Sequence, residues 1–190
     1  SSQLSALTTS QVSVLTTQQA SLLSTQQLAG IEAADASSLS TQFLSALTTA
    51  QVSGLSTASL AALTTAQLVS GIGTAITGLG GAQVVALTTN QAGALTSAQL
   101  QGLGTSQFAA FEATDARQLG TSALLALSAT QIGAFSSAAV AALSTEQVVF
   151  GLASDISGLG TAQVSAMGTA QVAALTTDQI AASLGSSSGL

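Results

Sequence analysis

The chain follows one eight-residue pattern, which runs over residues 7–182 without insertion or deletion. When octad positions are counted from Leu7, position 1 is an apolar residue, position 5 is most often Gln, and positions 7 and 8 are small. Position 6 is apolar in all 23 instances, from Leu4 to Ile180, and position 5 is Gln in 15 of them. So regular a pattern predicts a repeat array, in which neighbouring repeats bury a core that none could bury alone.

A longer period lies above the octad. Four octads depart from the consensus: IEAADASS at 31–38, GIGTAITG at 71–78, FEATDARQ at 111–118 and GLASDISG at 151–158. Each begins five octads after the one before it, and alternate members resemble each other, so the duplication unit is ten octads. From this period we expect five octads in each turn of the array.

Each octad carries the signals that begin an α-helix. In the octad that starts at Leu47, Thr48 and Gln51 have the spacing of a capping box, in which each side chain accepts from the other residue's backbone amide. Leu47 and Val52 have the spacing of the hydrophobic staple that accompanies such a cap. A new start in every octad leaves room for one or two helical turns, so we expect one very short helix per octad.

These signals favour an all-α solenoid that comprises residues 1–190 as a single repeat domain with an irregular tail at 183–190. The apolar residues of positions 1 and 6 should fill its axis, and the small residues of positions 7 and 8 should let backbones approach closely. The alternative is a β-solenoid, which tolerates the Thr, Val and Gly content. Positions 1 and 6 are an odd number of residues apart, however, so strand alternation would place them on opposite faces.

Composition excludes several classes of function. Arg117 is the only cation, which leaves no basic patch for nucleic acid. The chain has no Cys and no His, and Lys is absent as well, so thiolate and imidazole metal sites and base-activated serine nucleophiles cannot form. No apolar run reaches the roughly 18 to 20 residues of a membrane-spanning helix. With no His, we also expect stability to vary little between about pH 5 and 9.

The acidic residues are the strongest candidates for chemistry. Glu32 and Asp35, like Glu112 and Asp115, are three residues apart and would share a helix face, as a general acid–base pair or half a calcium site would require. We favour a structural interpretation, because Asp35 and Asp115 occupy the Gln position and can cap a helix instead. Arg117 should form a local ion pair with this second group. We therefore expect no catalytic, cofactor-binding or metal-binding residue.

Other departures from the consensus also have structural interpretations. Glu146 and Asp178 precede a position-5 Gln and should lie on a solvated face. The Gly-rich segment 71–81 lacks the Lys of a phosphate-binding loop, and we interpret it as a tight corner. The five Phe residues should fill the core or pack at its edge.

Strings such as LTTAQVSGLSTASLAALTTAQL at 47–68 and LGTAQVSAMGTAQVAALTTDQIAA at 159–182 resemble a known type of sequence array. These are the LTTAQVAAL arrays of very large secreted bacterial proteins, described as haemolysin-like, haemagglutinin-like or RTX-type adhesins. The resemblance covers nearly the whole chain. It implies an extracellular or cell-surface location and a structural or adhesive role, and it supplies no catalytic residue.

We accordingly expect a structural, non-catalytic module: an elongated spacer or stalk, or a self-assembling extracellular fibre, of a bacterial surface protein. Its partners would be other copies, end to end or side by side, with a surface glycan as a further possibility. The alternative is a binding module whose regularly spaced Thr and Ser hydroxyls, at octad positions 2 and 3, recognise ice or a polysaccharide. We expect no enzymatic activity.

Overall fold

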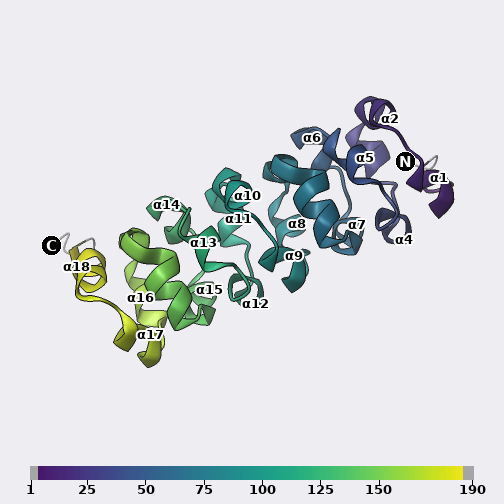
Figure 1. Cartoon of the computed structure of the whole chain (residues 1–190). Helices are drawn as coiled ribbons and strands as arrows, with labels where there is room; N and C mark the ends of the chain where they lie inside the picture. The colour runs from purple at the N-terminus through teal and green to yellow at the C-terminus, as the bar shows by residue number, and fades with distance from the viewer. Residues whose placement is uncertain (1–3, 186–190) are drawn as a thin grey trace. The chain divides into compact units, whose positions relative to one another are not determined.

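The computed structural model describes residues 4–185, which form short helices joined by extended corners (Figure 1). No β-strand occurs in that range, so the all-α prediction is confirmed and the β-solenoid alternative does not apply. The residues cluster into two compact units, Ser1–Gln91 and Ala92–Leu190. Each unit is described by itself below.

The first unit consists of helices of four to six residues. They are α1 (Thr9–Ser13), α2 (Thr17–Leu22), α3 (Thr25–Leu28), α4 (Ala33–Ala36), α5 (Thr41–Ser45), α6 (Thr49–Val52), α7 (Thr57–Ala62), the π-helix η1 (Gln67–Ile72), the 3-10 helix η2 (Gly73–Gly78) and α8 (Gly81–Val85). Helix α9 (Thr89–Gly93) begins in this unit and ends in the next.

The second unit repeats this order of elements. Its helices are α10 (Ser97–Gly102), α11 (Thr105–Ala109), α12 (Ala113–Ala116), α13 (Thr121–Leu124), α14 (Ala129–Gly133), α15 (Ser137–Ala142), the π-helix η3 (Gln147–Leu152), the 3-10 helix η4 (Ala153–Gly158), α16 (Thr161–Ala166), α17 (Thr169–Ala174) and α18 (Thr177–Gly185). Helix α18 includes 183–185, the start of the predicted irregular tail; residues 186–190 lie outside the described range.

Most octads form one short helix each, as the caps predict. The residue before most of the α-helices has an extended backbone, as at Thr48 with φ −75° and ψ 162°, which is the geometry of an N-cap. Extended residues also end several helices, such as Leu63 with φ −63° and ψ 144° after α7. The exceptions are 67–78 and 147–158, where a π-helix runs directly into a 3-10 helix.

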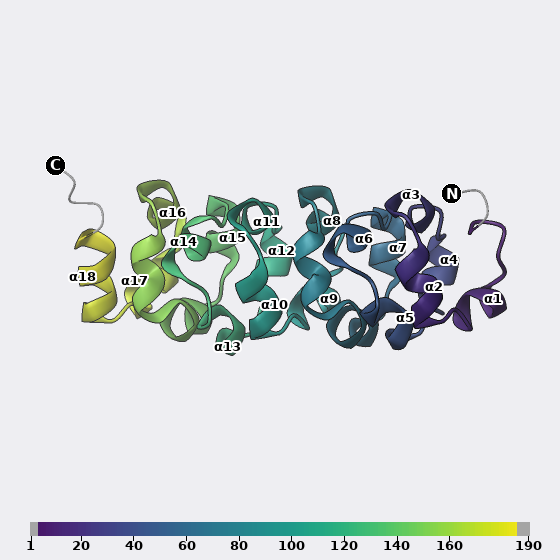
Figure 2. The same ribbon diagram turned by 90° about the horizontal axis from the view of Figure 1, so that it is seen from above.

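The turn of the array is shorter than the five octads that the sequence period suggested. In the first unit α4 packs against α7 (Figure 1), and in the second α12 packs against α15 (Figure 2). In the same way α5 packs against η1 and α13 against η3. The paired helices α4 and α7 begin three octads apart, at Ala33 and Thr57. Side-chain links between turns join residues 28 and 31 apart. The longer period therefore records where irregular octads occur, whereas the contacts set the turn at between three and four octads.

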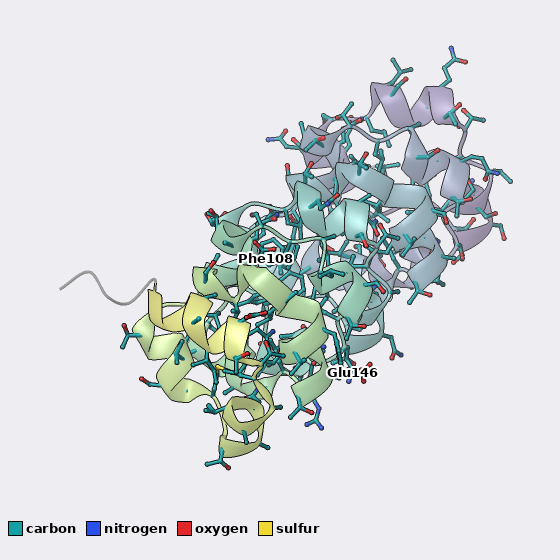
Figure 3. The ribbon with its side chains drawn as sticks, turned by 60° about the vertical axis from the view of Figure 1, so that its left-hand side comes forward. Phe108 and Glu146 are labelled. Carbon is teal, nitrogen blue, oxygen red and sulfur yellow. The ribbon has the colours of Figure 1, made fainter. Side chains whose placement is uncertain are left out.

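The core consists of the octad positions that the pattern predicts. In the first unit the position-1 residues Leu47 and Leu55 and the position-6 residues Val52 and Leu60 are buried. The second unit adds a cluster of three rings: Phe108 and Phe135 pack edge to face with centroids 5.1 Å apart, and Phe111 lies 5.8 Å from Phe108. Phe108, labelled in Figure 3, is completely buried. Such rings contribute more than their buried area alone.

Small residues allow the turns to pack closely, as expected. At Gly54, in position 8, an added Cβ would lie 2.6 Å from the carbonyl oxygen of Thr25, in the preceding turn. Any larger residue would force these two turns apart. The apolar core and the glycine contacts together place position-5 side chains such as Gln51 directly against the backbone of the turn before them.

Candidate functional site

Gln occupies octad position 5 in 15 of 23 instances, and Gln51 shows how such a residue begins its helix. In α6 the amide of Gln51 donates to the Thr48 hydroxyl at 3.2 Å, and the Gln51 side-chain oxygen accepts from the Thr48 amide at 2.9 Å. The predicted capping box is therefore present. Where the N-cap is Gly80 or Gly160, the glutamine half of the box remains.

The other end of the same glutamine binds the previous turn. Nε2 of Gln51 donates to the carbonyl oxygens of Ala20, at 2.8 Å, and of Leu23, at 2.7 Å. These carbonyls belong to the end of α2 and to the corner after it. One side chain therefore caps a helix with its oxygen and joins two turns with its nitrogen.

This link recurs in both units, and its commonest sequence separations are 28 and 31. The glutamines that make it include Gln51, Gln67, Gln83 and Gln91 in the first unit, and Gln131, Gln147, Gln163, Gln171 and Gln179 in the second. At octad 55–62 a shorter residue makes the same link, since the Ser59 hydroxyl donates to the carbonyl of Ile31 at 2.6 Å.

The first acidic pair does not form a joint site. Glu32 is the exposed N-cap of α4, and its side chain makes no capping bond. Asp35 is buried and accepts a hydrogen bond from the Thr9 hydroxyl at 2.8 Å. Instead of the local cap that its position suggested, the recorded bond of Asp35 joins α4 to α1.

The second acidic pair has an electrostatic consequence. Asp115 is only 2% exposed, and Glu112 lies nearby on the same short helix as its exposed N-cap. Burial, and secondarily the Glu112 charge, raises the pKa of Asp115 from 3.8 to about 6. The raised pKa predicts that stability changes with pH through this residue, in contrast to the flat profile expected from the absence of His.

The remaining charged residues do not gather into a site. Arg117 is the exposed C-cap of α12, and its ion pair with the acidic residues of this helix stays a prediction. Within residues 4–185, no three Asp or Glu side chains gather in a way that could hold a metal ion. Every buried side-chain nitrogen or oxygen there has a hydrogen-bond partner. The polar groups that the interior holds are thus engaged in the fold.

Hollows occur beside the π-helical corners. In the first unit a hollow of about 490 Å³ lies between the start of α6 and the η1–η2 junction, lined by hydroxyls that include Thr48, Thr49 and Thr74. In the second unit two smaller hollows lie beside Phe150. The Gly-rich segment 71–81, predicted as a tight corner, is where η1 passes into η2.

The sequence pattern missed the second function of Gln. A capping box accounts fully for a Gln three residues after Thr, so nothing in the octad calls for a further partner. The signal that was available is burial: a side chain flanked by core positions 1 and 6 in a packed array needs a partner for its amide nitrogen.

Comparison with known proteins gives a family match over part of the chain. Residues 153–182 match a family described as the ALTTAQ repeat. No curated protein and no solved structure is significantly similar to the chain. The match supports the assignment to a repeat family and agrees with the octads seen along the sequence. Separately, none of the helices within residues 4–185 has the length and apolarity needed to span a membrane.

Proposed function

We propose that the chain is a structural, non-catalytic repeat module that serves as a spacer or as the building block of an extracellular fibre. The observation that carries the proposal is the use of its polar side chains. The glutamines and N-cap hydroxyls that the sequence repeats are engaged in capping helices and joining turns, as in the Thr48–Gln51 box and its links to Ala20 and Leu23. Repeating these caps and links lengthens the array and adds to its stability.

We propose that copies associate end to end by the same contact that joins successive turns within the chain. In the first turn Gln11 and Gln19 are exposed, whereas Gln51 is buried by its bonds to the preceding turn. In the last turn Val172 and Ile180 are 46% and 40% exposed, whereas other position-6 residues, such as Val140, are completely buried. One face offers amide donors and the other offers apolar side chains, which are the two halves of the contact between successive turns.

Electron microscopy and light scattering after size exclusion would test the assembly. We expect filaments or concentration-dependent multiples of the 18.3 kDa chain. Replacing Val172 and Ile180 with Ser should shift the population toward monomer. Leu125→Ser is the matched control, because Leu125 is 54% exposed in the same unit but occupies position 7.

A chain that is monomeric at every concentration would contradict the proposed fibre, and only the proposed spacer function would then stand. The spacer has its own test in small-angle X-ray scattering, where we expect the largest dimension of the monomer to be well above that of a sphere of equal mass. A compact scattering profile would contradict it. The extracellular location and the membership of a bacterial surface protein remain part of the proposal, and localisation of the protein in the cells that produce it tests them.

The hydroxyl-lined hollow in the first unit favours polysaccharide over ice as a second candidate ligand. Thr48 is used in a cap, so a flat array of free position-2 hydroxyls is not available there, whereas Thr49 and Thr74 line a concave surface. A glycan array probed with the labelled chain tests this candidate. Binding that is lost on replacing Thr49 and Thr74 with Val would support it, and no binding to any glycan would contradict it.

A further inference from the structure

The most unusual exposed side chain is Phe150, which is 66% exposed. It occupies octad position 8, which is Ala, Gly or Ser in 19 of the 23 octads. Its counterpart ten octads earlier is Ser70. Phe150 lies in the π-helix η3, a type of helix that is often found at functional sites. Burial in the core does not account for this ring, although the sequence predicted that Phe residues would fill the core or its edge.

Two hollows lie beside the ring, and Val149 and Phe150 line both of them. One has about 460 Å³ and includes Ala174; the other has about 380 Å³ and includes Ala153 and Ala182. Volumes of this size accommodate side chains or small ligands. The floor of this surface is therefore apolar, with one aromatic face available for stacking. We call it the Phe150 surface.

Carboxylates lie at its rim. Glu146 lines one hollow and Asp178 the other, and both residues are exposed; Glu146 is labelled in Figure 3. The corresponding residues ten octads earlier are Ala66 and Ala98, so the aromatic ring and both charges are absent from the first copy of the duplication. Three departures from the repeat thus coincide at one place.

The negative charge and the aromatic ring of the Phe150 surface favour a cationic partner over the other classes of partner. A second copy of this chain could supply only one cation, because Arg117 is its only basic residue. Nucleic acid and anionic membranes would be repelled by Glu146 and Asp178 on a chain whose net charge is −6. A cationic side chain, by contrast, can pair with the carboxylates and stack on the Phe150 ring.

We propose that the Phe150 surface binds a protein segment in which apolar residues alternate with Lys or Arg. The apolar residues would occupy the hollows beside Val149 and Phe150. The basic residues would lie against Glu146 and Asp178. Because the ring and both carboxylates are dispensable to the contact between successive turns, the inference is independent of the end-to-end association proposed above.

A synthetic, fluorescently labelled peptide in which Leu alternates with Arg provides the probe. Anisotropy titration against the whole chain should give saturable binding that weakens with salt. The same peptide with Glu in place of Arg should not bind. Phe150→Ser, which installs the residue of position 70, should weaken binding by about tenfold or more, equivalent to about 1.4 kcal/mol.

A matched pair of charge variants separates this site from general attraction to an acidic chain. Glu146→Gln with Asp178→Asn should weaken binding by about tenfold and flatten its salt dependence. Glu32→Gln with Glu112→Gln removes the same charge from exposed positions elsewhere and should change binding less than about twofold. Leu125→Ser should likewise change the affinity for the peptide by less than about twofold. Circular dichroism should show that all variants are folded. Equal weakening by both charge pairs, an unchanged affinity in Phe150→Ser, or no binding by the parent chain would overturn the proposal.

Discussion

The segments 67–78 and 147–158 occupy corresponding places in the two units, and they differ at the residue where two helices meet. Both consist of a π-helix followed by a 3-10 helix. At the junction the backbone has a positive φ in both, 54° at Gly73 and 42° at Ala153. Glycine adopts this conformation without strain, whereas alanine does not. The second unit therefore keeps the same backbone although its sequence opposes it.

Two contacts that both segments share explain how the backbone is held. Gly71 and Gly151 begin their octads in place of Leu, and an added Cβ would lie 2.9 Å from the Cβ of Leu44 and 3.0 Å from that of Leu124, respectively. Gln67 and Gln147 each donate to three carbonyls of the preceding turn. Tertiary contacts thus decide the local backbone conformation, and the residue at the junction determines only how much strain energy that conformation carries.

The largest expected effect comes from changing the links between turns. Gln67→Glu and Gln147→Glu retain the oxygen that caps the helix but replace the amide donor with a carboxylate facing backbone carbonyls. Both variants should lose about 3 kcal/mol or more of unfolding free energy, because a buried charge is left without a partner. Urea denaturation followed by circular dichroism measures the loss.

Gln11→Glu is the control for this pair. Gln11 makes the same capping box with Thr8 but is exposed and caps the first helix. The carboxylate retains the cap there and meets water, so stability should change by less than about 0.5 kcal/mol. A loss as large as that of Gln67→Glu would show that the cap, and not the link between turns, is the important contact.

Adding a methyl group at the shared glycines should be the next largest change. Gly71→Ala and Gly151→Ala would each force a side chain into Leu44 or Leu124, and overpacking of this kind costs about 1 to 3 kcal/mol. Because the two Cβ contacts are nearly equal, the thermal midpoints should fall by similar amounts. A clear inequality would show that the two corners are not packed alike.

The glutamine links between turns and the close packing at Gly71 also show what could and could not be predicted from the sequence. The Thr48–Gln51 box and the buried Val52 follow from spacing within one octad, and both are present as predicted. The length of the turn depends on which backbone the Gln51 nitrogen reaches, at sequence separations of 28 and 31 that no octad encodes locally. The π-helix has a visible signal in Gly71, but close packing against Leu44 becomes evident only in three dimensions.

The acidic octads at 31–38 and 111–118 allow the two units to be compared by how their stability depends on pH. The folded-state pKa of Asp115 is about 6 and its ordinary value is 3.8, so the native state holds a proton that the unfolded state releases between these values. Stability should therefore fall as pH rises from about 4 to about 6, and then level off. Asp115→Asn should remove this slope, with a gain of about 1 to 2 kcal/mol at pH 7.

Asp35→Asn tests whether this slope belongs to Asp115. Asp35 lies ten octads earlier and accepts from the Thr9 hydroxyl, and Asp115 is untouched in this variant. The fall in stability between about pH 4 and 6 should therefore persist. Urea midpoints measured across this pH range test this assignment. If the slope disappeared in Asp35→Asn, it would not arise from Asp115.

The smallest effect returns to the junction itself. Ala153→Gly should stabilise the chain by about 1 kcal/mol, because relief of backbone strain outweighs the greater freedom of the unfolded chain. Gly73→Ala should destabilise it by a similar amount, and no atom lies within 4 Å of the added Cβ, so backbone strain alone sets the cost. Differential scanning calorimetry should show midpoints that move in opposite directions. If both variants lowered the midpoint, residue 153 would depend on contacts of its own methyl group.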